Sequence, residues 1–156
     1  MVDAAKIWKY LLICGILAPI FFIGTDVIAG ILYPGYNFID QSIGELSAVG
    51  APTRLLVVPL NLIYNMLLIA FVLGVWMTAG QNRLLRVTAV MILGNVVVTL
   101  IWAFFPMQLG ETVSNITIVL GAVNMIFFLL AIGFGAAAYE TGSAYTRLKY
   151  LRHFSS

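Results

Sequence analysis

The chain has 156 residues, of which 62% are hydrophobic and only 9% are charged, and its formal net charge is +2. Soluble domains are roughly 45–50% apolar and about 25% charged, so this composition excludes an ordinary soluble domain. The single cysteine, Cys14, excludes an internal disulfide, and the single histidine, His153, excludes a haem held by two histidines. No glycine-rich phosphate loop and no basic nucleic-acid footprint occur, so we expect no cofactor, no metal site and no nucleic-acid partner.

Four apolar runs of membrane-spanning length alternate with polar breaks along the chain. Each run has about 19 to 26 residues, close to the roughly 20 that cross a bilayer as a helix. The runs lack the alternation of barrel strands, so the sequence predicts an all-α polytopic membrane bundle in a single domain, 1–156. The expected elements are spans at 7–32, 55–79, 87–105 and 116–139, an outer loop at 33–54 and a cytoplasmic tail at 140–156.

The first span, 7–32, is interrupted by Pro19 and Asp26. Its apolar stretch is longer than the core of a signal peptide, so we expect it to be retained. Asp26 lies seven residues inside the expected boundary at Tyr33, at a depth of about 10 Å. A carboxylate at that depth costs roughly 2.5–3.5 kcal/mol and usually faces a bundle interior or a wet cavity. Asp26 is therefore either a carboxyl held by neighbouring helices, the interpretation we favour, or part of a functional site.

The outer loop, 33–54, is long for a connection in a compact fold, and such loops are often functional. A short helix is expected within it, because Ser42 and Glu45 have the spacing of a capping box. Apolar residues at 39, 43, 46 and 49 predict one stripe that lies on the outer membrane surface and covers the mouth of the bundle. The loop candidates for a site are Tyr36, Asp40, Ser42, Glu45 and Arg54.

The charged loop residues suggest acid–base chemistry or cation binding. Asp40 and Glu45 could act as acid and base or bind a cation, but two carboxylates fall short of the six to eight oxygens that calcium needs. Helix capping and solvation explain both residues as well. Three interpretations fit Arg54: an ion pair with Glu45, contact with a lipid phosphate, or a side chain that extends its charged end toward water. The last is the simplest.

The three later spans also carry polar side chains in the outer half of the membrane. Asn61 and Asn65 lie four residues apart on one helix face, at depths of about 9 and 15 Å. These residues predict either hydrogen bonds between helices, worth about 0.6 kcal/mol per pair and the interpretation we favour, or an outward-opening polar pocket under the loop. The pocket candidates are Asp26, Asn61, Asn65, Asn95, Thr99 and Asn124.

Short connections join the remaining spans and help to set the orientation. Residues 79–83 predict a tight hairpin, Pro106 is expected to end the third helix, and Ser114 is expected to cap the fourth. With four spans, seven of the eight Lys and Arg residues fall on the side of both termini, which predicts cytoplasmic termini in a plasma or inner membrane. The other side carries Arg54 and the acidic residues Asp40, Glu45 and Glu111.

Several motifs resemble those of a bacterial and archaeal membrane-protein family known as domain of unknown function 998. They are Gly15-Ile16-Leu17-Ala18-Pro19, Tyr33-Pro34-Gly35-Tyr36, the run from Ser42 to Pro52, and Phe105-Pro106-Met107. The resemblance implies a fold but no reaction. Family members often place acidic residues or histidine where this chain has Gln108 and Asn115, and they tend to continue into two further helices. By that comparison this chain is either a short form or a fragment.

The sequence favours a non-enzymatic binding or accessory protein, whose outward-facing polar pocket receives a lipid headgroup or a small polar ligand. The expected partners are membrane lipids, with a second copy of the chain or another membrane protein as alternatives. A membrane-embedded enzyme acting on lipid, with Asp26, Asp40 or Glu45 as acid and base, is disfavoured because the spans offer no nucleophile with a base, and we assign no catalytic residue. A further alternative is an oligomeric transporter with its coupling proton on Asp26.

Overall fold

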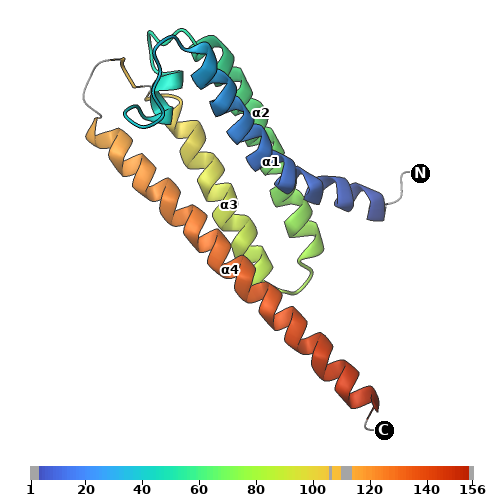
Figure 1. Ribbon diagram of the computed structural model, residues 1–156. Coiled ribbons are helices and arrows are strands. Elements are labelled where there is room, and N and C mark those ends of the chain that lie inside the picture. The colour runs from blue at the N-terminus through green and yellow to red at the C-terminus, as the bar shows by residue number, and fades with distance from the viewer. Residues whose placement is uncertain (1–3, 106, 110–113, 155–156) are drawn as a thin grey trace.

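The computed structural model describes residues 4–105, 107–109 and 114–154, with side chains described between 7 and 143 within those ranges. Figure 1 shows four long helices and one short helical turn, in the expected order. They are α1 (Ala4–Leu32), the 3₁₀ helix η1 (Ile43–Ser47), α2 (Arg54–Thr78), α3 (Arg83–Trp102) and α4 (Asn115–Phe154). The described residues contain no strand beyond one isolated bridge, so the predicted all-α class is confirmed.

All four long helices are long and apolar enough to cross a membrane, over Ile7–Leu32, Arg54–Thr78, Arg83–Trp102 and Asn115–Ser143. In their most apolar stretches only 11–28% of the residues are buried inside the protein. Large apolar side chains therefore cover the outside of the bundle, an arrangement that is unfavourable in water and stable against acyl chains. The prediction of a multi-pass membrane protein is confirmed.

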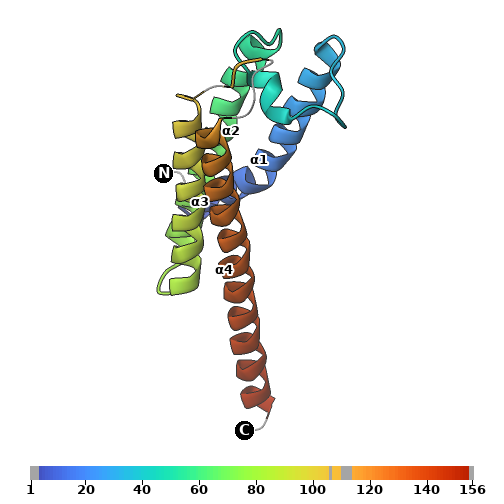
Figure 2. The same ribbon diagram turned by 90° about the vertical axis from the view of Figure 1, so that its left-hand side faces the viewer.

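The helices form two antiparallel pairs, α1 with α2 and α3 with α4, which meet where α2 packs against α3. Within the described residues α1 and α4 make no contact with each other (Figures 1 and 2). The first pair is held closely at Gly74, where an added Cβ would lie 2.8 Å from the Leu11 Cβ and 3.2 Å from the α1 backbone. Figure 1 shows a bend in α1, and Pro19 lies inside this helix. A proline removes one helical hydrogen bond and thereby favours a bend.

Two expected boundaries were wrong. Helix α3 begins at Arg83 rather than 87, because the Asn82 side chain accepts hydrogen bonds from the backbone N–H groups of Leu84 (3.0 Å) and Leu85 (3.3 Å). It ends at Trp102, three residues earlier than expected. Pro106 and Glu111 lie outside the described residues, and the expected stop at Pro106 stays a prediction. The expected tail, 140–156, is helical as far as Phe154, its last described residue. Figures 1 and 2 show α4 continuing past the α2–α3 hairpin.

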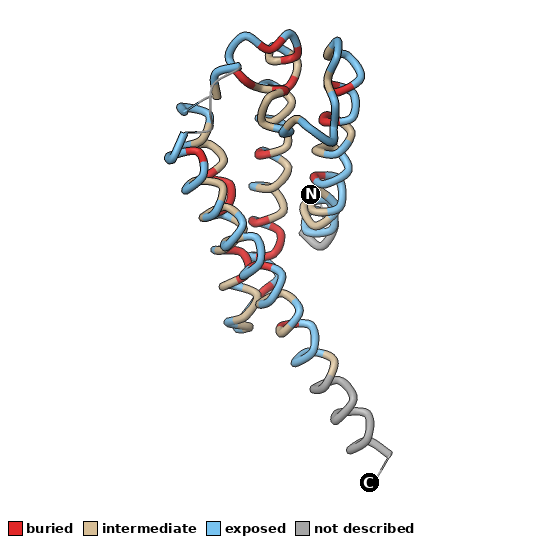
Figure 3. The backbone as a smooth tube through the Cα atoms, turned by 60° about the vertical axis from the view of Figure 1, so that its left-hand side comes forward, coloured by how far each residue is buried: buried red, intermediate tan, exposed pale blue. Residues whose placement is uncertain are grey.

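The segment 33–53, here called the η1 loop, folds over one end of the helices. Ser42 caps η1 as predicted, and its N–H donates to the Glu45 carboxylate at 3.1 Å. The prediction of a single apolar stripe along the loop was wrong. Leu46 is fully buried against α1 and α2, whereas Ile39 is 91% exposed. The helix η1 is only five residues long, so it does not bring these side chains to one face. Figure 3 shows the buried segments of the loop and of the helix faces that meet beneath it.

Hydrogen bonds fix the second half of the η1 loop, one to the connection between α3 and α4 and one within the loop itself. The Val49 N–H donates to the Met107 carbonyl at 2.7 Å, which links the loop to the connection between α3 and α4. The Thr53 hydroxyl donates to the Leu46 carbonyl at 2.8 Å, and Thr53 is itself buried. Ser114 begins the last helix as predicted, since its hydroxyl accepts from the Thr117 N–H at 3.2 Å. The bond between Val49 and Met107 holds the loop at the end of the bundle where the polar side chains gather.

Candidate functional site: a polar cavity between the two helix pairs

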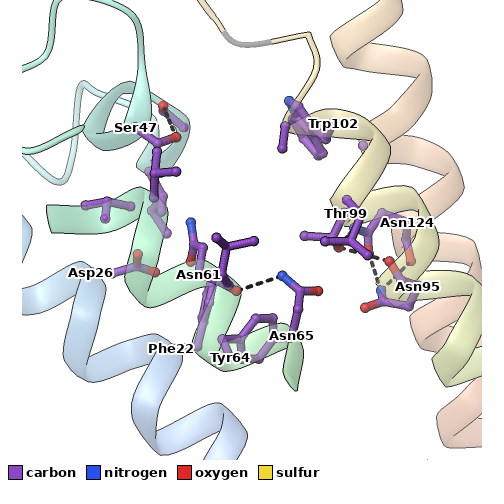
Figure 4. Close-up of a pocket in the computed structure, with 18 of the residues that line it drawn as sticks. Phe22, Asp26, Ser47, Asn61, Tyr64, Asn65, Asn95, Thr99, Trp102 and Asn124 are labelled. Carbon is purple, nitrogen blue, oxygen red and sulfur yellow. Dashed lines mark hydrogen bonds between the residues drawn. The ribbon is translucent and has the colours of Figure 1, made fainter. Parts of the chain in front are cut away.

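A cavity of about 540 Å³ lies between the two helix pairs and under the η1 loop. This volume is in the range of small-molecule and cofactor sites. Both α1 and α4 line the cavity, and within the described residues these two helices do not contact each other. All six pocket candidates line it, as Figure 4 shows: Asp26, Asn61, Asn65, Asn95, Thr99 and Asn124.

The α3–α4 wall of the cavity carries a closed hydrogen-bond network. The Asn95 side-chain amide donates to the Asn124 carboxamide oxygen, and the Asn124 amide donates to the Thr99 hydroxyl at 3.0 Å. The Thr99 hydroxyl in turn donates to the Asn95 backbone carbonyl at 2.9 Å. The bonds from Asn95 to Asn124 and from Asn124 to Thr99 join the two helices, whereas the Thr99 bond returns to the backbone of α3 (Figure 4). The interhelical interpretation is therefore confirmed for this wall.

The α1–α2 wall is different, because two of its acceptors, the Asn65 side-chain oxygen and the Asp26 carboxylate, have no partner among the described residues. Asn65 is only 4% exposed, and its side-chain amide donates to the Asn61 backbone carbonyl of its own helix at 2.7 Å. Its side-chain oxygen, Oδ1, is buried with no hydrogen-bond partner and points away from α2 toward the cavity in Figure 4. Asp26 is 7% exposed, and its carboxylate also points into the cavity. Among the described residues no hydrogen bond and no ion pair reaches that carboxylate.

Of the five loop candidates, only Arg54 lines the cavity. Its guanidinium Nη1 donates to the Ser47 carbonyl at 2.7 Å, so the side chain is held beside η1 at the loop end of the cavity. It makes no ion pair with Glu45 within the described part of the chain. The expected alternative of an Arg54–Glu45 pair is therefore wrong, because the Ser47 carbonyl holds the guanidinium instead.

The other loop candidates stay outside the cavity and stabilise the loop. The Asp40 carboxylate accepts from the Asn37 side-chain amide, and the Glu45 carboxylate accepts from the Ser42 N–H and the Gln41 side chain. The structure brings Asp40 and Glu45 into no common site with Asp26. A catalytic acid and base in the loop stays a prediction that no geometry here favours.

Tyr36 packs at the base of the η1 loop, against the cluster that contains Leu46. Its hydroxyl donates to the Gln41 carbonyl at 3.4 Å. Burial raises the pKa of the Tyr36 phenol above its ordinary value, and the carboxylates of Glu45 and Asp26 raise it further. Tyr36 therefore stays a neutral phenol at physiological pH and serves to position the loop.

Sequence reasoning missed the aromatic part of the lining. Phe22, Tyr64 and Phe128 line the cavity together with Trp102, beside the polar residues already identified. Their positions carry a signal that could have found them. Phe22 precedes Asp26 by four residues, Phe128 follows Asn124 by four, and positions four apart share a helix face. The cavity thus presents acceptors and donors on an otherwise apolar lining.

The polar groups of the cavity determine what it could bind. Within the described ranges no three His, Cys, Asp or Glu side chains gather in a way that could hold a metal ion. The cavity offers the Asp26 carboxylate and the Asn65 oxygen as acceptors, and the Arg54 guanidinium as a positively charged donor. Such a set can receive a ligand that carries both a donor and an acidic group.

Comparison with known proteins gives one match, to a protein family. No curated protein and no solved structure matches the chain. Residues 16–154 match the model of one protein family, described as a protein of unknown function (DUF998). Since the match covers most of the 156 residues, the chain belongs to the DUF998 family of proteins of unknown function.

Proposed function

We propose that this membrane protein is a non-enzymatic binding or accessory protein, and that its cavity receives a polar group in the outer half of the bilayer. The ligand is a lipid headgroup or a small polar molecule that reaches the cavity under the η1 loop or between α1 and α4. The cavity's size, its mixed polar and aromatic lining and its position between two helix pairs support this proposal.

One observation carries the proposal: the side-chain oxygen of Asn65, on the α1–α2 wall, is buried without a hydrogen-bond partner. An unsatisfied buried polar group costs about 1–3 kcal/mol, so it is retained only where something offsets that cost. The Asn65 Oδ1 atom is in this state, and the Asp26 carboxylate, which no hydrogen bond reaches among the described residues, lines the same cavity. A bound ligand that donates to them would satisfy both groups at once.

The test measures ligand-induced thermal stabilisation of the purified, delipidated protein in detergent. The probe is an equal mixture of dioctanoyl phosphatidylethanolamine, phosphatidylglycerol and phosphatidylcholine. We expect the mixture to raise the unfolding temperature of the wild type and to raise it much less in Asp26→Asn and Asn61→Leu. Asp40→Asn, which alters a carboxylate outside the cavity, is the matched control and should respond as the wild type does. Equal shifts in all four proteins, or no shift in any, would contradict the proposal.

We also propose that both termini are cytoplasmic and that the η1 loop faces the outside of a plasma or inner membrane. Seven of the eight Lys and Arg residues support this orientation, because positive charge is retained on the cytoplasmic side. A fluorescent protein fused to the C-terminus should fluoresce, whereas alkaline phosphatase at the same position should be inactive. An active phosphatase fusion would reverse the orientation.

A further inference from the structure

The two charged side chains of the cavity have opposite signs and are not paired with each other. Asp26 comes from α1 and lies among the helices, whereas Arg54 begins α2 and is held at Ser47, at the loop end of the same cavity. In Figure 4 Ser47 lies on the loop side of Asp26. No ion pair joins any of the described residues, so each charge is open to a charged group of a ligand. A zwitterion with its cation toward Asp26 and its anion toward Arg54 matches this arrangement.

The neutral polar groups near Asp26 specify the kind of cation. The Asn65 Oδ1 atom accepts no hydrogen bond from the protein, and it faces the same cavity as the Asp26 carboxylate. A primary ammonium has three N–H donors, so it can donate to acceptors of this kind. A quaternary ammonium has no N–H donor and would leave Asn65 Oδ1 unsatisfied. The wall therefore favours a primary ammonium over a trimethylammonium.

The anion is specified by Arg54 and by its place near the end of a span. Only one of its five N–H donors is used, in the bond to the Ser47 carbonyl. A guanidinium with free donors binds phosphate oxygens strongly and can bind two of them in parallel. Arg54 begins α2 at the boundary of a membrane span, where lipid phosphates lie. A phosphodiester is thus the anionic group that this residue fits.

The apolar part of such a ligand would leave the cavity between α1 and α4, which do not contact each other within the described residues. Phe22 of α1 and Met125 and Phe128 of α4 line the cavity. Both α4 residues are largely exposed, at 62% and 56%, on a helix that spans the membrane. Acyl chains leaving the cavity between the two helices would therefore pass from one apolar surface to another.

We propose that the ligand is an aminophospholipid, whose primary ammonium binds Asp26 and Asn65 while its phosphodiester binds Arg54 and its acyl chains leave between α1 and α4. This inference rests on the proposed binding function and narrows it to one headgroup chemistry. It distinguishes the ligand from anionic lipids, which offer Asp26 no cation, and from choline lipids, which offer Asn65 no donor.

The experiment titrates the full-length protein in detergent with the three dioctanoyl phospholipids separately and measures the apparent affinity from thermal shifts. Phosphatidylethanolamine should bind about tenfold more tightly than phosphatidylcholine, because one hydrogen bond to a charged group is worth about 1.5–3 kcal/mol. Asp26→Asn should abolish this preference, and Arg54→Gln should weaken binding of all three lipids. The control Asp40→Asn should change neither affinity nor preference.

A second variant protects the test against misfolding of the Asp26 variant. Asn65→Leu removes the neutral acceptor, so it should reduce the preference for phosphatidylethanolamine over phosphatidylcholine while leaving phosphatidylglycerol binding unchanged. Equal affinities for the three lipids in the wild type, or tightest binding of phosphatidylglycerol, would overturn the aminophospholipid proposal and leave the binding function standing. No binding of any lipid would overturn both.

A soluble arm distinguishes the two sources of the same headgroup chemistry. Glycerophosphoethanolamine carries the ammonium and the phosphodiester without acyl chains, and it should stabilise the wild type at least tenfold more weakly than the dioctanoyl lipid. Equal potency would overturn the lipid as the source, since the acyl chains would then contribute nothing. Weaker binding of the soluble molecule supports passage of the chains between α1 and α4.

Discussion

The two walls of the cavity face each other across one space but differ in whether their polar groups are hydrogen-bonded within the protein. On the α3–α4 wall, the side chains of Asn95, Thr99 and Asn124 bond to one another across two helices. On the α1–α2 wall, Asp26 and the Asn65 oxygen face the cavity without partners, and the described parts of α1 and α2 share no side-chain hydrogen bond. One wall joins its polar side chains across two helices, whereas the other presents acceptors to the cavity that no group of the described residues satisfies.

The two helix pairs also differ in how they are held together. The α1–α2 pair relies on close apolar packing, with Gly74 against the α1 backbone and the rings of Phe22 and Tyr64 at 5.1 Å between centroids. The α3–α4 pair adds its hydrogen-bond network to such packing, since Gly94 lies against the ring of Phe127. Lipid tails are as apolar as the helices, so close packing and hydrogen bonds supply most of the association energy. The predictions below disturb each wall separately.

The largest effect is expected from Gly74→Val, which forces a side chain into the α1 backbone. Overpacking of this kind costs about 1–3 kcal/mol, because helix α1 must move away. The measurement is the midpoint of SDS-induced unfolding in mixed micelles. Gly133→Val is the matched control, because an added Cβ at Gly133 meets nothing within 4 Å. An unchanged midpoint for Gly74→Val would mean that the pair is not held by close approach there.

Asn124→Leu should lower the free energy of unfolding by about 1.5 kcal/mol, near the upper limit measured for hydrogen bonds between membrane helices. The substitution removes the acceptor of the Asn95 amide and the donor to Thr99. The neighbouring exchange Met125→Leu, which keeps the volume and removes no hydrogen bond, serves as its control. In the Asn124→Leu background, Thr99→Val should add little further loss, since its interhelical partner is already gone. Additive losses would show that the two residues act independently.

Asn65→Leu should have the opposite sign and stabilise the delipidated protein by about 1 kcal/mol, because it removes a buried oxygen that has no partner. The same substitution should reduce stabilisation by phosphatidylethanolamine, so stability and binding should change in opposite directions. Asn61→Leu should stabilise less, because Asn61 is only half-buried. If Asn65→Leu destabilises the delipidated protein, the oxygen is satisfied by some other group, and the contrast between the walls is lost.

The smallest effect is expected at the η1 loop, where Glu45→Ala should cost about 0.5 kcal/mol by removing the acceptor of the Ser42 N–H. Hydrogen exchange of the loop amides should increase in this variant, with little change in α2 or α3. Asp40→Ala, which removes a neighbouring exposed carboxylate, should leave the exchange around η1 unchanged. Faster exchange along the whole of α2 would instead give the capping box a role in the stability of the bundle.

Much of the fold was predictable because the membrane imposes its own length and polarity on the sequence. Four apolar runs, the bounds of the first two spans and the capping of η1 by Ser42 all follow from local patterns. The boundary at Arg83 was missed, because the cap at Asn82 extends α3 into a basic turn that hydropathy alone excludes. The candidate residues of the cavity were predictable as polar side chains at similar depth, since lipid makes such residues rare and therefore conspicuous.

The sequence by itself determined that this chain spans a membrane four times and that polar groups from every helix lie in one layer, because insertion depends on composition and on rise per residue. Only the tertiary structure decided which of those groups bond to each other. The pairing of α3 with α4 brings the Asn95 amide to the Asn124 side-chain oxygen, whereas no neighbouring helix brings a donor to the Asp26 carboxylate or to the Asn65 side-chain oxygen. Hydrogen bonds need contact within about 3 Å, and contact between distant helices depends on packing that no local pattern encodes.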